Sequence, residues 1–294
     1  MDEIAARKIY MIDTVALGFR RIVACYLIMD ERTALIDTGY ASSLSEIISE
    51  LVSHNVRLDY IIPTHVHLDH CGGAAGLARH FPSAKVMALS SAVKHLINPE
   101  RLVESVKLVY GPDILNVFGN VEPIPEERVQ AVSDGEVLRL GGSELTFLYT
   151  PGHAPHQISI HESESNMVLT ADAVPAQYPD FRAIIPTTPP PSFDPQQYEE
   201  SMRRLGRLNA RQFLTPHYGP TEATMERVEK LILRTRNWIS ILSQAGGDEI
   251  GHTMETLRRG LEEEAGKPLP QYAENLLRIS VMGILKYLGK RQLF

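Results

Sequence analysis

Four potential metal ligands lie within six residues of one another, in the segment His-Val-His-Leu-Asp-His that starts at His65. Imidazole and carboxylate groups together suit zinc, and they also suit iron or manganese. On an extended backbone the side chains of His65 and His67 point to the same side, so both can reach one ion. Asp69 and His70 follow where the chain begins to turn, and they can reach a second ion nearby. Such a loop has no packing rationale, because a buried polar group without a partner costs about 1–3 kcal/mol.

One loop cannot complete the ligand shells of two ions, because zinc is typically four-coordinate. Three further donors occur at matching places elsewhere in the chain. His153 lies in TPGHAPH, Asp172 in TADA and His217 in TPHYG, and each follows a short apolar segment. A rigid sheet delivers ligands from such strand ends. The sequence therefore predicts a centre for two metal ions.

Short apolar runs and amphipathic stretches predict the elements that position these donors. The expected strands are 21–28, 34–36, 60–62, 86–89, 136–140, 145–149, 157–160, 167–169 and 213–215. Ser43 and Glu46 have the spacing of a capping box before one helix, 74–80 predicts a second, and Asp194 with Pro195 begins a third. Helical pieces and loops are expected from 93 to 132. The proline-rich stretch 175–195 is expected to be an irregular surface loop.

Composition limits the class of protein. The chain has 294 residues, a formal net charge of −7 and only two cysteines, Cys25 and Cys71. These numbers exclude a disulfide framework and a cysteine zinc site, and they favour a reducing compartment. The first residues carry no apolar signal segment, and no run of about 18 apolar residues suggests a membrane span. A cytoplasmic protein without membrane contact is expected.

The composition changes after residue 220. We expect one large metal-binding domain over 1–220 and a helical extension over 221–294, with a long helix near 228–242, a break at Gly246 and Gly247, and a last helix near 277–288. The extension is interpreted either as a packed cap that contributes substrate contacts or a homodimer surface, or as a winged-helix-like module. Its formal charge of +1, against −8 for 1–220, favours the first interpretation, and nucleic acid is not an expected partner.

The order THxHxDH, PGH, an Asp after a strand, and a final PH before Gly resembles the metallo-β-lactamase fold superfamily, in its glyoxalase II-like and lactonase-like branch. The resemblance covers about residues 8–220. It implies an α+β fold, an αββα sandwich. It also implies that His65, His67 and His153 bind one metal ion, that Asp69, His70 and His217 bind the other, and that Asp172 bridges both.

The resemblance implies further roles near the ligands. An acidic residue at the position of Asp37 typically hydrogen-bonds a ligand histidine. His156 stands where such proteins commonly have Gly, and it is a candidate for an outer hydrogen-bonding group. Asp69 and Asp172 are the expected catalytic carboxylates. Tyr178, Arg182 and Tyr218, together with the segment between Ala92 and Val132, are candidates for contacting substrate.

These implications favour a dinuclear hydrolase in which a metal-bridging hydroxide attacks the carbonyl of a small ester, thioester or lactone, with phosphodiesters as secondary substrates. Two divalent ions are expected, zinc first, with iron or manganese as alternatives. Two other activities use the same loop. One is a mono-iron dioxygenase that oxidises a sulfur substrate, and the other is a tRNA-processing type of ribonuclease, which the acidity of 1–220 disfavours. Histidine rather than Arg at position 70 disfavours β-lactam hydrolysis.

Overall fold

The structure is a computed structural model that describes residues 1–5, 8–246 and 249–290. Backbone contacts divide the chain into two compact units. The first unit comprises Met1–Tyr149, His156–Ala171 and Arg211–Pro220, and the second comprises Thr150–Pro155, Asp172–Ala210 and Thr221–Phe294. The boundary expected at residue 220 is thus one of the points where the chain passes between units. The second unit also takes in two segments from before that boundary.

The first sheet has seven strands in sequence order. They are β1 (Asp2–Ala5), β2 (Ile9–Asp13), β3 (Ala24–Met29), β4 (Thr33–Ile36), β5 (Tyr60–Ile62), β6 (Lys85–Leu89) and β7 (Val129–Val132). The pairs from β1 to β4 are antiparallel, and those from β4 to β7 are parallel. Because parallel strands end at the same edge of a sheet, the residues that follow β4 and β5 leave from one place. Asp37 follows β4, and the segment with the four donors follows β5.

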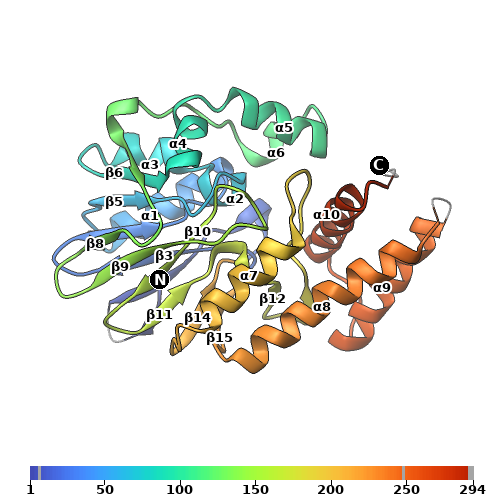
Figure 1. The fold of residues 1–294 in the computed structure, drawn as a ribbon. Helices are drawn as coiled ribbons and strands as arrows, with labels where there is room; N and C mark the ends of the chain where they lie inside the picture. Colours follow the sequence, from blue (N-terminus) through green and yellow to red (C-terminus); the bar gives the residue numbers. More distant parts are fainter. Residues whose placement is uncertain (6–7, 247–248, 291–294) are drawn as a thin grey trace. The chain divides into compact units, whose positions relative to one another are not determined.

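The first unit also contains helices, some of which pack against this sheet (Figure 1). They are α1 (Leu44–Ser53), α2 (Leu68–Cys71), α3 (Ala74–His80), α4 (Ser90–Ile97), α5 (Glu100–Tyr110) and α6 (Leu115–Phe118), with short 3-10 turns η1 (Ala16–Gly18), η2 (Ala41–Ser43) and η3 (Glu126–Arg128). α3 packs against β5 and β6, and α4 packs against β6 and β7. The predicted capping box is wrong. Ser43 precedes α1, but its side chain makes no capping hydrogen bond. Ser43 is also the last residue of η2, so its backbone (φ −93°, ψ 2°) is not in the extended conformation typical of an N-cap.

The second sheet has six strands in the order β15-β14-β11-β10-β9-β8. Their bounds are β8 (Val137–Arg139), β9 (Glu144–Tyr149), β10 (Ile158–Glu162), β11 (Met167–Leu169), β14 (Gln212–Thr215) and β15 (Gly219–Thr221), with the turn η4 (Ala171–Ala173) after β11. β10 is antiparallel to both β9 and β11, whereas β14 is parallel to β11. β9, β11 and β14 therefore run in the same direction and end at one edge of the sheet.

Hydrogen bonds join the two sheets within the first unit. The amide of Ala24 in β3 donates to the Pro216 carbonyl at 2.9 Å, and the Tyr26 hydroxyl donates to the Thr215 carbonyl at 2.6 Å. The amide of Ile158, at the start of β10, donates to the Thr64 carbonyl at 2.9 Å. The ends of β14 and β10 are thus held against the first sheet and against the segment that follows β5.

The second unit is mainly helical. Its helices are α7 (Pro195–Gly206), α8 (Met225–Gln244), α9 (Ile250–Ala265) and α10 (Gln271–Tyr287), and Figure 1 draws the last three in orange to red. The predicted start of α7 is confirmed, because the Asp194 carboxylate accepts the Gln197 amide at 3.0 Å and Pro195 is the first helical residue. α9 was not predicted from the sequence. The predicted break falls partly on Gly247, which lies outside the described residues.

The prediction of an irregular surface loop over 175–195 is wrong. This stretch contains the antiparallel pair β12 (Ala176–Tyr178) and β13 (Phe181–Ile185), in which Tyr178 and Phe181 are buried. The apolar side chains of this hairpin are covered by their own unit, since β13 packs against α9 and α10. The expected α+β class with C-terminal helices is confirmed. Among the described residues, no helix has the length and apolar character that a membrane span requires.

Candidate metal centre

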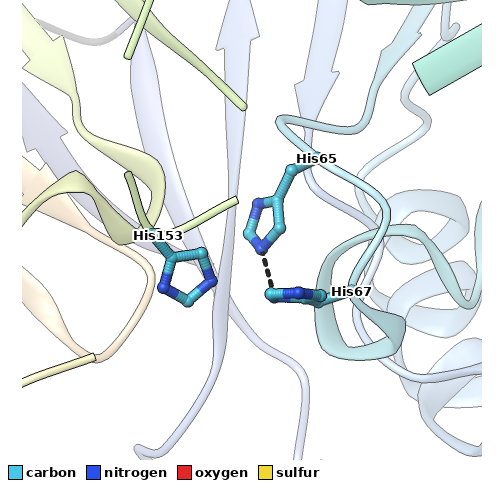
Figure 2. A group of neighbouring side chains, drawn as sticks. All are labelled: His65, His67 and His153. Atoms are coloured by element: carbon cyan, nitrogen blue, oxygen red, sulfur yellow. Dashed lines mark hydrogen bonds between the residues drawn. The ribbon is translucent and has the colours of Figure 1, made fainter. Parts of the chain in front are cut away.

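The segment after β5 brings buried imidazoles together. Pro63 ends the strand, and α2 then turns the chain back, so that His65 and His70 are fully buried. Nε2 of His65 lies 3.0 Å from Nδ1 of His67, and the two rings meet edge to face. Figure 2 draws this contact as a dashed line, together with His153, whose own partners are described below. Two imidazole nitrogens at this separation can serve one metal ion or share one proton.

Asp37 orients two of these histidines through hydrogen bonds. Its backbone has a φ of 62°, a left-handed conformation that Asp tolerates better than most residues. Oδ2 of Asp37 lies 2.8 Å from Nδ1 of His70, and Oδ1 accepts both the amide and the hydroxyl of Thr64 at 2.8 Å. The Thr64 hydroxyl in turn lies 3.1 Å from Nδ1 of His65. One buried carboxylate thus orients His70 directly and His65 through Thr64.

A second group in the first unit consists of Asp69, His70 and His217. Their ligand atoms all lie within 4.8 Å of one another. Oδ2 of Asp69 lies 3.4 Å from Nε2 of His70 and 3.5 Å from Nε2 of His217. Nδ1 of His217 lies 3.1 Å from the Ile22 carbonyl, which directs the ring. Two imidazoles and a carboxylate are therefore aimed at a common point.

The second unit contributes a pair, His153 and Asp172. Nε2 of His153 lies 3.4 Å from Oδ2 of Asp172, and Nδ1 of His153 lies 2.9 Å from the Thr187 carbonyl. The Thr187 hydroxyl lies 3.1 Å from the Asp172 carbonyl and 2.7 Å from the Tyr198 hydroxyl. These contacts link both donors to α7, on which Tyr198 lies.

The hydrogen bonds fit this donor set for a divalent metal ion. Nδ1 of His70, His153 and His217 each faces an oxygen acceptor at 3.1 Å or less. A hydrogen on Nδ1 satisfies that acceptor and leaves the lone pair on Nε2, the form of imidazole that binds metal ions. In all three residues Nε2 is the atom that approaches a carboxylate of the proposed ligand set. A metal-bound histidine usually donates its other ring N–H to an oxygen acceptor in this way.

The other predicted site residues occupy different surroundings. Nδ1 of His156 lies 3.5 Å from the Val66 amide, so this ring borders the metal-binding segment. Tyr218 is buried, and burial is the main cause that raises the pKa of its phenol, followed by the charge of Asp13. Tyr178 packs edge to face on Tyr272 within the second unit.

Arg182, the remaining predicted contact, is exposed on β13. Its carbonyl accepts the side-chain amide of Gln177 at 2.6 Å, which closes the β12–β13 hairpin. This bond involves the backbone of Arg182, so it leaves the predicted substrate role of the guanidinium as a prediction.

Sequence reasoning did not single out Thr64, Thr187 or Tyr110. Thr64 is recognisable as the first letter of THxHxDH, but its bridge from Asp37 to His65 depends on strand pairing. Thr187 is far from its partners in sequence and carries no motif. Tyr110 lies in the segment between Ala92 and Val132, which was expected to border the site only as a whole. The negative charge of Asp69 contributes, after burial, to raising the pKa of the Tyr110 phenol, so its hydroxyl lies in the field of that carboxylate.

Comparison with known proteins gives one family for most of the chain. The family model described as the metallo-beta-lactamase superfamily matches residues 18–230. The metallo-beta-lactamase fold-containing protein ST1585 of Sulfurisphaera tokodaii is 29% identical over 265 residues, which are 87% of this chain and 97% of ST1585. The crystal structure of ST1585 from Sulfolobus tokodaii has a TM-score of 0.72 at 27% identity, and the match covers 97% of this chain and 99% of that one.

Shorter stretches resemble two enzymes of different classes. Hydroxyacylglutathione hydrolase GloC of Haemophilus influenzae is 32% identical over 153 residues, which are 51% of this chain and 66% of GloC. The coenzyme F420H(2) oxidase of Methanothermobacter marburgensis is 31% identical over 150 residues, which are 49% of this chain and 32% of the oxidase. The matched stretches are thus compatible with either hydrolytic or redox enzymes.

Proposed function

Because the chain belongs to the metallo-β-lactamase superfamily, we propose that it is a hydrolase that uses two divalent metal ions to cleave an ester, thioester or lactone bond of a small molecule. The observation that carries this proposal is the arrangement of His70, His153 and His217, each of which turns Nδ1 to an oxygen acceptor and Nε2 toward a carboxylate. Such anchoring serves a metal centre and has no evident use in an apolar core.

The proposed ligands are seven side chains. His65, His67 and His153 would hold one ion, Asp69, His70 and His217 would hold the other, and Asp172 would be a ligand of both. Zinc is the first candidate because it takes imidazole and carboxylate ligands in this proportion, and iron or manganese would also suit.

Chain topology supports this combination of donors. Leu169 of β11 pairs with Leu214 of the parallel strand β14. Asp172 and His217 each follow three residues after one of these paired leucines. His153 lies in the connection between the antiparallel neighbours β9 and β10, in which Ile158 pairs with Tyr149, and β9 ends at that edge as well. This shared edge of the second sheet supports the proposed ligand set.

When bound, the two ions would lower the pKa of a coordinated water toward about 7 and so supply a nucleophile at neutral pH. The chain provides the orientation. Asp37 and Thr64 keep His70 and His65 in fixed directions, and the Asp69 carboxylate, only 20% exposed, lies beside Nε2 of both His70 and His217. We propose that Asp69 and Asp172 position the attacking water, so that no Ser or Cys nucleophile is needed.

The similarity to GloC favours a carbonyl substrate, since that relative is named as a hydrolase of hydroxyacylglutathione. We propose a small-molecule substrate and no nucleic-acid or membrane partner. We also propose a cytoplasmic setting, because the two buried cysteines are free thiols. The helices α8 to α10 are proposed to cap the enzyme or to form a homodimer surface. The oxidase relative makes redox chemistry the competing class, and the identity of the bound metal together with oxygen consumption distinguishes the two.

The decisive experiment measures metal content and turnover on the same protein, purified without added metal. We expect close to two ions per chain by mass spectrometry, and hydrolysis of at least one member of a panel of glutathione thioesters, acyl-homoserine lactones and aryl esters. A chelator should abolish turnover and zinc should restore it. His217→Ala should lose metal and activity, whereas His80→Ala, on the exposed end of α3, should keep both. One iron per chain with oxygen consumption, or turnover of phosphodiesters alone, would contradict the proposal.

A further inference from the structure

Three aromatic side chains form a row in the first unit. The ring of Tyr110, at the end of α5, meets the ring of Phe118 edge to face, with centroids 5.3 Å apart and an interplanar angle of 74°. Phe118, at the end of α6, stacks on Tyr40 with centroids 4.6 Å apart. The backbone holds this row closely, because a Cβ on Gly119 would lie only 2.6 Å from the Ser42 amide nitrogen. α6 is therefore fixed against the turn η2 that follows Tyr40.

The Tyr40 end of the row is tied to the metal-binding segment. Both the amide and the hydroxyl of Thr38 donate to the carbonyl of His70, each at 2.8 Å. The Gly73 amide donates to the carbonyl of Gly39 at 3.1 Å, immediately before Tyr40. Tyr40 thus follows directly on two residues that are hydrogen-bonded to the end of that segment. The aromatic row starts beside the residues that hold His70.

The Tyr110 end of the row is near the same segment and is open to an incoming molecule. Burial raises the pKa of the Tyr110 phenol, and the negative charge of Asp69 raises it further. The phenol hydroxyl can donate a hydrogen bond. Tyr110 as a whole is nevertheless 45% exposed, whereas Phe118 is only 6% exposed. Phe118 packs against both tyrosines, and Tyr110 remains partly accessible.

We propose that Tyr110 is a substrate-binding residue whose hydroxyl donates to a substrate oxygen and whose ring selects acyl groups that carry an aromatic ring. This inference rests on the proposed hydrolase function and narrows its substrate class to aryl-bearing esters, thioesters or lactones. Edge-to-face and offset contacts between aromatic rings give such groups about a threefold to tenfold advantage beyond the area they bury. An ester with a short aliphatic acyl group would make neither contact with the ring.

Calorimetric binding of phenylacetate and acetate to the zinc-loaded full chain tests the proposal without turnover. We expect phenylacetate to bind the unaltered protein about tenfold more tightly than acetate. Tyr110→Ala should reduce that ratio by about threefold to tenfold. Tyr110→Phe should keep the ratio and weaken both acids by about threefold to tenfold, because it loses only the hydroxyl. Leu108→Ala, a matched change on the same helix at a residue 88% exposed, should alter neither value.

Hydrolysis of phenylacetyl and acetyl thioesters of one thiol gives the second readout. The ratio of kcat/KM for the two should fall in Tyr110→Ala, with unchanged metal content, and Tyr110→Leu replaces that variant if it does not fold. An unchanged ratio in both assays would overturn the proposed role of Tyr110 while leaving the hydrolase function standing. Phenylacetate binding that depends on Tyr110, without hydrolysis of any substrate, would instead contradict the proposed function and support the aromatic site.

Discussion

Oδ2 of Asp37 lies 2.8 Å from Nδ1 of His70, and both groups are almost completely buried. The other carboxylate oxygen accepts two hydrogen bonds from Thr64, so Asp37 makes three contacts that all require an acceptor. A residue one strand away in the sheet thus fixes the imidazole of a proposed ligand. The parallel pairing of β4 and β5 makes this contact available, because Ile36 and Ile62 are partners in register.

Asp37→Asn should weaken metal binding by about 10- to 100-fold, the usual effect of removing an outer hydrogen bond to a ligand histidine. An asparagine retains one acceptor oxygen, so its NH₂ group must face a donor of either His70 or Thr64. Competition with a chelating dye measures the zinc affinity. Asp59→Asn is the matched control, because that carboxylate also accepts a backbone amide, that of Thr33 at 2.9 Å. Equal affinities in the two variants would contradict the role given to Asp37.

Asp172→Ala tests the shared ligand. The carboxylate lies 3.4 Å from Nε2 of His153 in the second unit, and the proposal requires it to contact both ions. We expect close to one ion per chain in place of two, and kcat/KM lower by at least about 100-fold, since a metal ion supplies several kcal/mol of stabilisation to the transition state. Asp180→Ala, in the exposed turn between β12 and β13, serves as the control. Retention of both ions and of turnover would overturn the scheme of seven ligands.

The parts of the fold that could be predicted have strong local signals. β5 and β11 have the predicted bounds, 60–62 and 167–169, because each is a short apolar run with a clear stop. The start of α7 was equally predictable, since Asp194 and Pro195 carry their preference in their own side chains. The donors after these strands could be named for the same reason. A polar residue just beyond an apolar run is conspicuous in sequence.

Contacts between distant segments could not be predicted in this way. The β12–β13 pair lies in a proline-rich stretch, and Phe181 is buried in a strand that packs against α9 and α10. Tyr110 looks like an ordinary residue at the end of a helix, and its contact with Phe118 depends on how α5 packs beside α6. Such relationships depend on packing between elements, which the local pattern does not record.

Two glycines in helices of the second unit should respond in opposite ways to alanine. A Cβ on Gly283 of α10 would lie 1.8 Å from the Thr188 carbonyl oxygen, whereas one on Gly260 of α9 meets nothing within 4 Å. Gly283→Ala should therefore lower the free energy of unfolding by at least about 2 kcal/mol through overpacking against backbone. Gly260→Ala should raise it by about 0.5–1 kcal/mol, because alanine is the better helix former. Urea denaturation of the two variants gives both values, and a neutral Gly283→Ala would contradict the close packing of α10 on Thr188.

The two cysteines should resist alkylation in the folded protein and make its stability fall at high pH. Burial raises the pKa of Cys25 well above its usual value, and raises that of Cys71 to about 12. In the unfolded chain both thiols ionise near pH 9, so their contribution to stability is complete below that pH and is lost as the pH rises above it. Between pH 9 and 10 the two thiols should lower the free energy of unfolding by about 2 kcal/mol in total.

Urea titrations at pH 9 and pH 10 measure this change, and the double variant Cys25→Ala/Cys71→Ala should show a correspondingly smaller loss. Iodoacetamide at pH 8 should modify neither thiol in the native protein and both in urea, because only the thiolate reacts. Alkylation of native Cys71 at the rate of the unfolded chain would show that the thiol is accessible and ionised. That result would contradict its burial beside His70 and would make it a competitor of the proposed ligands.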